Sequence, residues 1–308
     1  GEDGNDTLFG DAGDDSINGG DGDDFIFETI GNDPLRLAVV GRPNVGKSTL
    51  INRLVGEDRL LAFDQPGTTR DSIAVPFERD GQAYILVDTA GVRRRSRVDD
   101  RIEKFSIIKT LQAIEGAHGA VVMLDGRSGV VDQDLHLLGL VVDAGRGLVV
   151  AVNKWDHLPV EQKSQVRREL ERRLGFLTFA DVHFISALHG TGVVDVLASL
   201  RVACESARRK FSTPELTRLL ETVVAQHPPP AVGRGQRIKL RYAHQGGQNP
   251  PVIVIHGGRT DQVPISYRRY LTNAFRDALG LKGTPLVVEL RSGENPYRPG
   301  ERRPPKSR

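Results

Sequence analysis

Cysteine is almost absent from this sequence, since Cys204 is the only one among 308 residues. A single thiol excludes a disulfide framework and any zinc site built on cysteines. Long hydrophobic runs are also missing: the longest apolar stretches, such as 148–152 and 252–255, are far too short to cross a bilayer. The acidic N-terminus lacks the basic start and apolar core of a signal peptide. We therefore expect no membrane span, and the length predicts two or three domains.

Positive charge is missing from one end of the chain. Residues 1–34 contain 11 acidic residues and no Lys or Arg, whereas residues 208–308 contain 19 basic and 7 acidic residues. Residues 35–207 are nearly neutral, with 23 basic and 22 acidic residues. The overall charge of +2 is therefore a cancellation between zones of different character. We expect the basic zone to divide into a domain at 208–298 and a Pro- and Arg-rich tail at 299–308.

The first 27 residues repeat with a period of nine, and each repeat carries an Asp at a matching position: Asp6, Asp15 and Asp24. The pattern resembles the G-G-x-G-x-D-x-U-x nonapeptides of the RTX family, which stack as a short β-solenoid. The resemblance implies that these carboxylates bind Ca²⁺, a cation that prefers hard oxygen ligands. An acidic, glycine-rich tail that does not fold stays open as the alternative.

The central zone opens with a strand, a loop and a helix. An apolar run at 35–40 predicts a buried parallel strand, and TLINRLVG predicts an amphipathic helix. Between them, GRPNVGKS matches the G-x-x-x-x-G-K-S phosphate loop in its required context. Lys47 can reach the β- and γ-phosphates, and the Ser48 hydroxyl can bind Mg²⁺. The expected nucleotide contacts in this loop are Gly41, Arg42, Pro43, Asn44, Val45, Gly46, Lys47, Ser48 and Thr49.

Three further motifs follow in order, each after a predicted strand. DTAG starts at Asp88, whose carboxylate is placed to support Mg²⁺. NKWD ends at Asp156, which can accept from both the N1–H and the exocyclic amine of guanine and so selects GTP over ATP. The SAL motif would meet guanine O6 through its backbone. The expected contacts in these motifs are Asp88, Thr89, Ala90, Gly91, Val92, Asn153, Lys154, Trp155, Asp156, Ser186, Ala187 and Leu188.

These motifs in one order, each at a strand end, predict an α/β fold of the P-loop type, in its Ras-like, translation-factor form, with the site at the carboxyl ends of parallel strands. Many GTPases orient the attacking water with a Gln directly after the DTAG motif, and Val92 stands there instead. Asn44 resembles the Asn that marks potassium-activated GTPases, where it helps bind K⁺ beside the phosphates together with switch-I carbonyls, here at 63–65. A plain turn-forming role for Asn44 stays open.

Longer runs, among them GRPNVGKSTLINRL, DQPGTTRDSI, DTAGVRRRSRV and AVNKWD, resemble the second GTPase domain of the Der (EngA) family of bacterial double GTPases. The resemblance covers residues 35 to about 298. It implies Mg²⁺-dependent hydrolysis of GTP to GDP with Lys47, Thr69, Gly91 and Asn44 in catalytic positions, and Ser48, Thr69 and Asp88 around Mg²⁺. It also implies a cytoplasmic role in assembling the large (50S) ribosomal subunit through rRNA. The arginines of 93–97 either couple the second switch to such a contact or form a solvated charge run.

The basic zone predicts the order α-β-β-α-β, which resembles the KH-like domain that closes the Der family. We expect a helix at 213–227 capped by Thr213, and a strand at 236–244 that turns Ile238, Leu240 and Tyr242 to one side. The remaining elements are expected at 252–255 (strand), 264–279 (helix) and 286–290 (strand). There is no G-x-x-G loop between paired helices, so we expect RNA contact through the +12 charge of 208–308 rather than through that clamp.

The two resemblances imply different compartments. RTX repeats usually belong to secreted proteins, whereas ribosome assembly is cytosolic, and the chain has one GTPase domain where the Der family has two. A second hypothesis is therefore a non-enzymatic, calcium-dependent adhesion or secretion segment that carries a silent GTPase fold. A third, a single-GTPase rRNA chaperone of the Era type, is weakened by the missing G-x-x-G loop. The sequence leaves the oligomeric state open.

Overall fold

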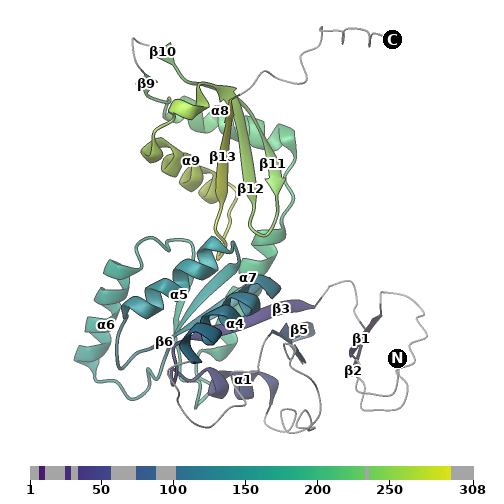
Figure 1. Cartoon of the computed structure of the whole chain (residues 1–308), viewed down its shortest axis with the longest axis vertical. Helices are drawn as coiled ribbons and strands as arrows, with labels where there is room; N and C mark the ends of the chain where they lie inside the picture. Colours follow the sequence, from purple (N-terminus) through teal and green to yellow (C-terminus); the bar gives the residue numbers. More distant parts are fainter. Residues whose placement is uncertain are drawn as a thin grey trace. The chain divides into compact units, whose positions relative to one another are not determined.

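The computed structural model (Figure 1) describes residues 7–10, 25–28, 34–56, 74–87, 102–232 and 236–292. The chain divides into two compact units. The first comprises 1–207 with 282–285, and the second comprises 208–281 with 286–308. The expected switch loop around Thr69 lies outside the described residues, and so does the whole DTAG motif.

The first unit is built around a six-stranded sheet with the order β4-β5-β3-β6-β7-β8. Its strands are β3 (Leu35–Gly41), β4 (Val75–Arg79), β5 (Gln82–Leu86), β6 (Gly119–Asp125), β7 (Gly147–Asn153) and β8 (Asp181–Phe184). Only β4 runs antiparallel, paired with β5, and the other neighbours are parallel. Every residue of β7 is buried, which is why residues 147–152 form a continuous apolar run without alternation.

Helices cover both faces of this sheet (Figure 1). On one face α1 (Lys47–Val55) and α7 (Val193–Arg208) pack against strand residues such as Val121 and Val149. On the other face the core contains α4 (Ile102–Gly116), α5 (Asp132–Asp143) and α6 (Val160–Arg173) with strand residues such as Val122 and Val150. Neighbouring strand residues thus face opposite cores, as the pleat requires. The predicted α/β class and the strand–loop–helix opening are confirmed.

The second unit has the predicted order α-β-β-α-β. Its main elements are α8 (Thr213–Gln226), β11 (Lys239–Gly247), β12 (Val252–Gly258), α9 (Ile265–Ala278) and β13 (Val287–Ser292). In the sheet β11-β12-β13, β11 is antiparallel to β12 and β12 is parallel to β13. The core between sheet and helices includes Leu216 and Leu220 from α8, Leu271 and Phe275 from α9, and Ile255 from β12. Shorter elements β9 (Ala231–Val232), β10 (Gln236–Arg237) and the 3₁₀ turn η1 (Thr260–Gln262) complete the unit.

Two expectations for this unit were wrong. The residue that caps α8 is Ser212 rather than Thr213, because the Ser212 hydroxyl accepts the N–H of Glu215 at 3.3 Å and has the extended backbone of an N-cap. Tyr242 does not join Ile238 on the core side. A register shift between Leu240 and Tyr242 inserts a bulge into β11, and a one-residue slip turns later side chains to the other face.

Two short strands in the acidic zone, β1 (Thr7–Gly10) and β2 (Phe25–Glu28), pair in parallel with Thr7 opposite Phe25. The partners are 18 residues apart, which is two nonapeptide repeats. Asp6, Asp15 and Asp24, the expected calcium ligands, lie outside the described residues. Across the part of the chain that the structure describes, no helix is both long enough and apolar enough to cross a membrane.

Candidate nucleotide-binding site

The loop between β3 and α1 depends on two glycines with positive φ. Gly41 has φ +155°, and a Cβ there would lie 2.6 Å from the backbone oxygen of Met123. Gly46 has φ +103°, and a Cβ there would lie 2.3 Å from the Asn153 amide nitrogen. Asn44 also has φ +63°, a left-handed conformation that Asn tolerates better than most residues. The loop can therefore curl tightly over the start of α1.

Lys47 is the first residue of α1, and its side chain folds back over the loop. Its Nζ donates to the backbone oxygens of Gly41 and Arg42, both at 2.8 Å. Burial lowers the pKa of this amine from its usual range, since a charged ammonium is poorly solvated there. The first-turn N–H groups of α1 have no intrahelical acceptors, so helix start and ammonium together present donors to an anion. The start of α1 and the Lys47 ammonium could therefore bind a phosphate group.

Asn153, at the end of β7, joins three of the predicted motifs. Its buried side chain donates from Nδ2 to the Val45 oxygen at 2.8 Å and accepts the Ala187 N–H at Oδ1, at 2.9 Å. The phosphate loop, the NKWD motif and the SAL motif are therefore held together by one amide. This contact also occupies the N–H of Ala187, while Leu188 next to it is 64% exposed.

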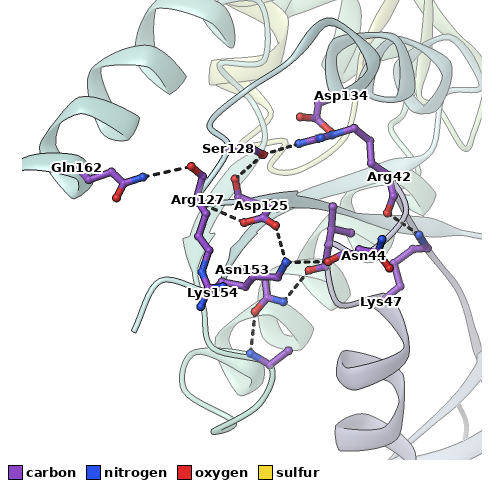
Figure 2. Close-up of polar contacts among 12 residues, drawn as sticks. Arg42, Asn44, Lys47, Asp125, Arg127, Ser128, Asp134, Asn153, Lys154 and Gln162 are labelled. Atoms are coloured by element: carbon purple, nitrogen blue, oxygen red, sulfur yellow. Dashed lines mark hydrogen bonds and ion pairs between the residues drawn. The ribbon is translucent and has the colours of Figure 1, made fainter. Parts of the chain in front are cut away.

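Lys154 extends the same connection (Figure 2). Its Nζ donates to the Asn44 oxygen at 2.8 Å and to Asp125 Oδ2 at 2.5 Å. Asp125 ends β6, so the carboxyl ends of three parallel strands, β3, β6 and β7, meet at this point. The sequence motifs did not include Asp125, although its position at the end of an apolar strand was the available signal.

A second anchor of the loop was also missed. Arg42 Nε donates to Asp134 Oδ1 at 2.7 Å, and Arg42 Nη2 donates to Ser128 Oγ at 2.8 Å (Figure 2). Asp134 lies in the first turn of α5, is fully buried, and also accepts the Val131 N–H at 3.1 Å. One carboxylate thus caps α5 and pairs with the phosphate loop. Sequence reasoning could not find it, because the two partners are 92 residues apart.

Asp156 follows Asn153 by three residues and stands at the open edge of the site. Desolvation raises its pKa, but its own backbone N–H, His157, a hydrogen bond from Ser186, and His189 outweigh this, so the pKa lies below the usual range. The lowered pKa favours the ionised carboxylate, which accepts hydrogen bonds at both oxygens.

Trp155 lies against the Phe184 ring, with centroids 4.2 Å apart, and the Arg167 guanidinium covers both rings. This aromatic packing holds Trp155, the residue before Asp156, against the end of β8.

The structure brings most of the expected site residues together around the phosphate loop. The phosphate loop, NKWD and SAL lie at the same edge of the sheet. Thr69 and the DTAG residues Asp88, Thr89, Ala90 and Gly91, with Val92 after them, lie outside the described residues. Ser48 is an exposed residue in the first turn of α1, and its hydroxyl could bind a magnesium ion.

The doubly wound sheet and the anchored phosphate loop define the class: this is the P-loop GTPase fold. Family models agree and divide the chain in three. Residues 36–154 match the 50S ribosome-binding GTPases, and residues 210–291 match the KH-domain-like, C-terminal part of EngA bacterial GTPase enzymes. Residues 1–33 match the RTX calcium-binding nonapeptide repeat. Both units therefore match the Der (EngA) family of GTPases.

The similarity to curated relatives extends over both units. The GTPase Der of Hahella chejuensis is 60% identical over 263 residues, which are 85% of this chain and 56% of that protein. The GTPase Der of Thioalkalivibrio sulfidiphilus is 62% identical over the same shares. The chain therefore spans about half the length of the curated relatives it matches. A crystal structure of Era with MgGDPNP and a 16S rRNA fragment aligns with 21% identity and a TM-score of 0.44, covering 84% of this chain and 92% of that one.

Proposed function

We propose that this chain binds GTP and hydrolyses it to GDP and phosphate with Mg²⁺. The observation that carries the proposal is the Asn153 side chain, which connects the Val45 oxygen in the phosphate loop to the Ala187 N–H in the SAL loop. A phosphate-binding loop and a base-reading loop are useful only when they are held at a constant separation. The high identity to curated GTPases of the Der family supports the same function.

Within this proposal each group has a defined task. The first-turn N–H groups of α1 and the ammonium of Lys47 hold the phosphates, and Asp156 reads the guanine N1–H and amine. Ser48, with Thr69 and Asp88, holds Mg²⁺, which when bound neutralises charge on the β- and γ-phosphates. The expected boundaries, 35–207 for this domain and 208–298 for the KH-like domain, belong to the same proposal.

Base selection has a direct test. We expect Asp156→Asn to shift preference from GTP toward xanthosine triphosphate, because an amide can donate to the xanthine oxygen that replaces the guanine amine. Fluorescent nucleotide titrations measure both affinities in the full chain. Unchanged guanine preference would contradict the role of Asp156, and absence of any nucleotide binding in the unmodified chain would favour the non-enzymatic alternative.

Potassium activation is the finer part of the proposal. The Asn44 side chain would help to hold K⁺ beside the phosphates, where positive charge stabilises the transition state. Its left-handed backbone agrees equally with a turn-forming role. We expect faster GTP turnover in K⁺ than in Na⁺ at equal ionic strength, and a loss of the difference in Asn44→Ala. Equal rates in both salts would leave only the turn-forming role.

The proposed partner is ribosomal RNA of the 50S subunit, in the cytoplasm. The +12 charge of residues 208–308 supports a phosphate-backbone contact, and the name of the matched family, 50S ribosome-binding GTPase, points to the same particle. Co-sedimentation with 50S and 30S subunits at several salt concentrations tests it. We expect 50S binding that weakens steeply with salt, and equal binding to both subunits would contradict the assignment.

Calcium binding at residues 1–33 is the remaining proposal, supported by the family match and by the two-repeat offset between β1 and β2. Calorimetry with Ca²⁺ on the full chain and on a chain lacking residues 1–34 separates this site from the rest. No heat at millimolar Ca²⁺ would reject it. Because RTX repeats usually work outside the cytosol, the result also bears on where the protein acts.

A further inference from the structure

Two histidines converge on the carboxylate that ends the NKWD motif. His157 follows Asp156 directly, and His189 comes from the loop after β8. His157 Nε2 lies 3.0 Å and His189 Nε2 lies 3.2 Å from the same oxygen, Asp156 Oδ2. One ligand atom from each of the three residues falls within 4.8 Å of the others. Neither histidine is among the expected nucleotide contacts, although both help to lower the pKa of Asp156.

Two of the three distances between these atoms are close to those of a tetrahedral metal site. Metal–ligand bonds of about 2.0–2.2 Å at tetrahedral angles put neighbouring ligand atoms roughly 3.3–3.6 Å apart. The two carboxylate–imidazole distances are only slightly shorter than this. The imidazole rings meet edge to face with centroids 5.9 Å apart, so both nitrogens can point at one position without the rings stacking.

The donor set selects the kind of ion. Two imidazole nitrogens and one carboxylate oxygen suit Zn²⁺ and neighbouring transition metals, whereas Mg²⁺ and Ca²⁺ prefer oxygen ligands throughout. The side chains of His157 and His189 are 63% and 54% exposed, so an ion can enter from solvent and keep water as its fourth ligand. Asp156 carries the negative charge that such an ion needs, and its side chain is 24% exposed.

The geometry points to a regulatory metal site: Asp156, His157 and His189 bind Zn²⁺ or a similar transition-metal ion, and the bound ion excludes the guanine base. The exclusion rests on the proposed function, in which the carboxylate of Asp156 accepts the two guanine donors. A metal on Oδ2 removes an acceptor and places positive charge against those donor hydrogens. Metal and guanine nucleotide therefore compete for one side chain.

The metal site itself is tested without nucleotide. The full chain, freed of nucleotide and metal, is titrated with Co²⁺ while its visible absorption is recorded, and with Zn²⁺ by calorimetry in excess Ca²⁺ to fill oxygen-ligand sites. We expect a tetrahedral Co²⁺ spectrum and one Zn²⁺ per chain. In a His157→Gln/His189→Gln variant, Zn²⁺ binding should weaken by about tenfold or more, because two of three protein ligands are lost. His136→Gln, an exposed histidine of α5, is the matched control.

The competition is tested with a fluorescent GDP in buffered Zn²⁺. At a free Zn²⁺ concentration ten times its Kd, exclusive binding raises the apparent Kd for GDP about tenfold in the unmodified chain. The double variant and its control separate this from chelation of Zn²⁺ by the nucleotide, which affects all proteins equally.

Each outcome has one meaning. Equal Zn²⁺ affinity in the unmodified chain and the double variant overturns the site. Zn²⁺ binding that leaves GDP affinity unchanged overturns the exclusion. If GDP does not bind at all, the proposed function fails, while the Co²⁺ spectrum still decides whether the metal site exists.

Discussion

Asp134 offers the sharpest test of how the phosphate loop is held. Its fully buried carboxylate pairs with Arg42, whose side chain is only 18% exposed. Asp134→Ala would leave that guanidinium charge without its partner and remove the cap of α5. Breaking a buried ion pair on one side costs roughly 3–5 kcal/mol, and because Arg42 keeps some contact with water we expect about 3 kcal/mol.

The assay is urea or thermal unfolding followed by the fluorescence of Trp155, which as the only tryptophan reports on the first unit. For a unit of this size, about 3 kcal/mol corresponds to a Tm lower by roughly 6–12 °C. Asp132→Ala is the matched control, because Asp132 lies in the same helix, is 94% exposed and pairs with Arg173. Exposed pairs contribute less than about 1 kcal/mol. Equal losses of stability in both variants would mean that the Arg42–Asp134 pair does not stabilise the first unit.

The double variant Arg42→Met/Asp134→Leu separates charge from packing. Removing both partners leaves no uncompensated charge, so we expect it to recover most of the stability that Asp134→Ala loses. Nucleotide affinity should fall about tenfold in Asp134→Ala, or about 1.4 kcal/mol, because the Arg42 oxygen is one of two acceptors that position Lys47. Unchanged affinity would mean that the ion pair stabilises the fold without positioning the site.

Three further predictions concern single residues. Gly46→Ala should lower Tm and nucleotide affinity more than Gly56→Ala does, because both have positive φ but a Cβ at Gly56 meets nothing within 4 Å; equal losses would exclude the clash with Asn153. Asn153→Ala should cost about 2–4 kcal/mol in urea unfolding, since two buried backbone groups lose their partner; a loss under about 1 kcal/mol would contradict this. Burial raises the pKa of Tyr267 to about 12, so the stability that its neutral form provides is present below pH 10 and falls as pH rises toward 12, because the unfolded chain ionises first. When unfolding is followed by circular dichroism, the free energy of unfolding should depend less on pH in Tyr267→Phe than in the unmodified chain. The same pH dependence in both proteins would contradict this prediction.

The local parts of the site were predictable because each depends on neighbouring residues. A phosphate loop needs glycines at fixed offsets, a lysine at the helix start and an apolar strand before it, and all of these lie within about 20 residues of sequence. The order of elements in the second unit was predictable for the same reason, since α8 and α9 bury apolar stripes at helical spacing.

The features that could not be predicted from the sequence depend on contacts between residues far apart in the chain, or on a one-residue bulge in a strand. Arg42 and Asp134 are ordinary charged residues in the sequence, and only the crossing from β3 to α5 makes them a buried pair. Asp156, His157 and His189 come together because β7 and β8 are adjacent and parallel. The bulge in β11 changes the face of Tyr242 without any glycine or proline to announce it at that position.

The sequence by itself determined the class of fold and the similarity to the Der (EngA) GTPases, because both depend on short motifs whose spacing is imposed by backbone geometry. Only the tertiary structure decided which side chains hold the motifs in place. The physical reason is the packing of parallel strands, which brings the ends of β3, β6, β7 and β8 to one edge of the sheet. Charged side chains that are far apart in the sequence therefore come within hydrogen-bonding distance of one another.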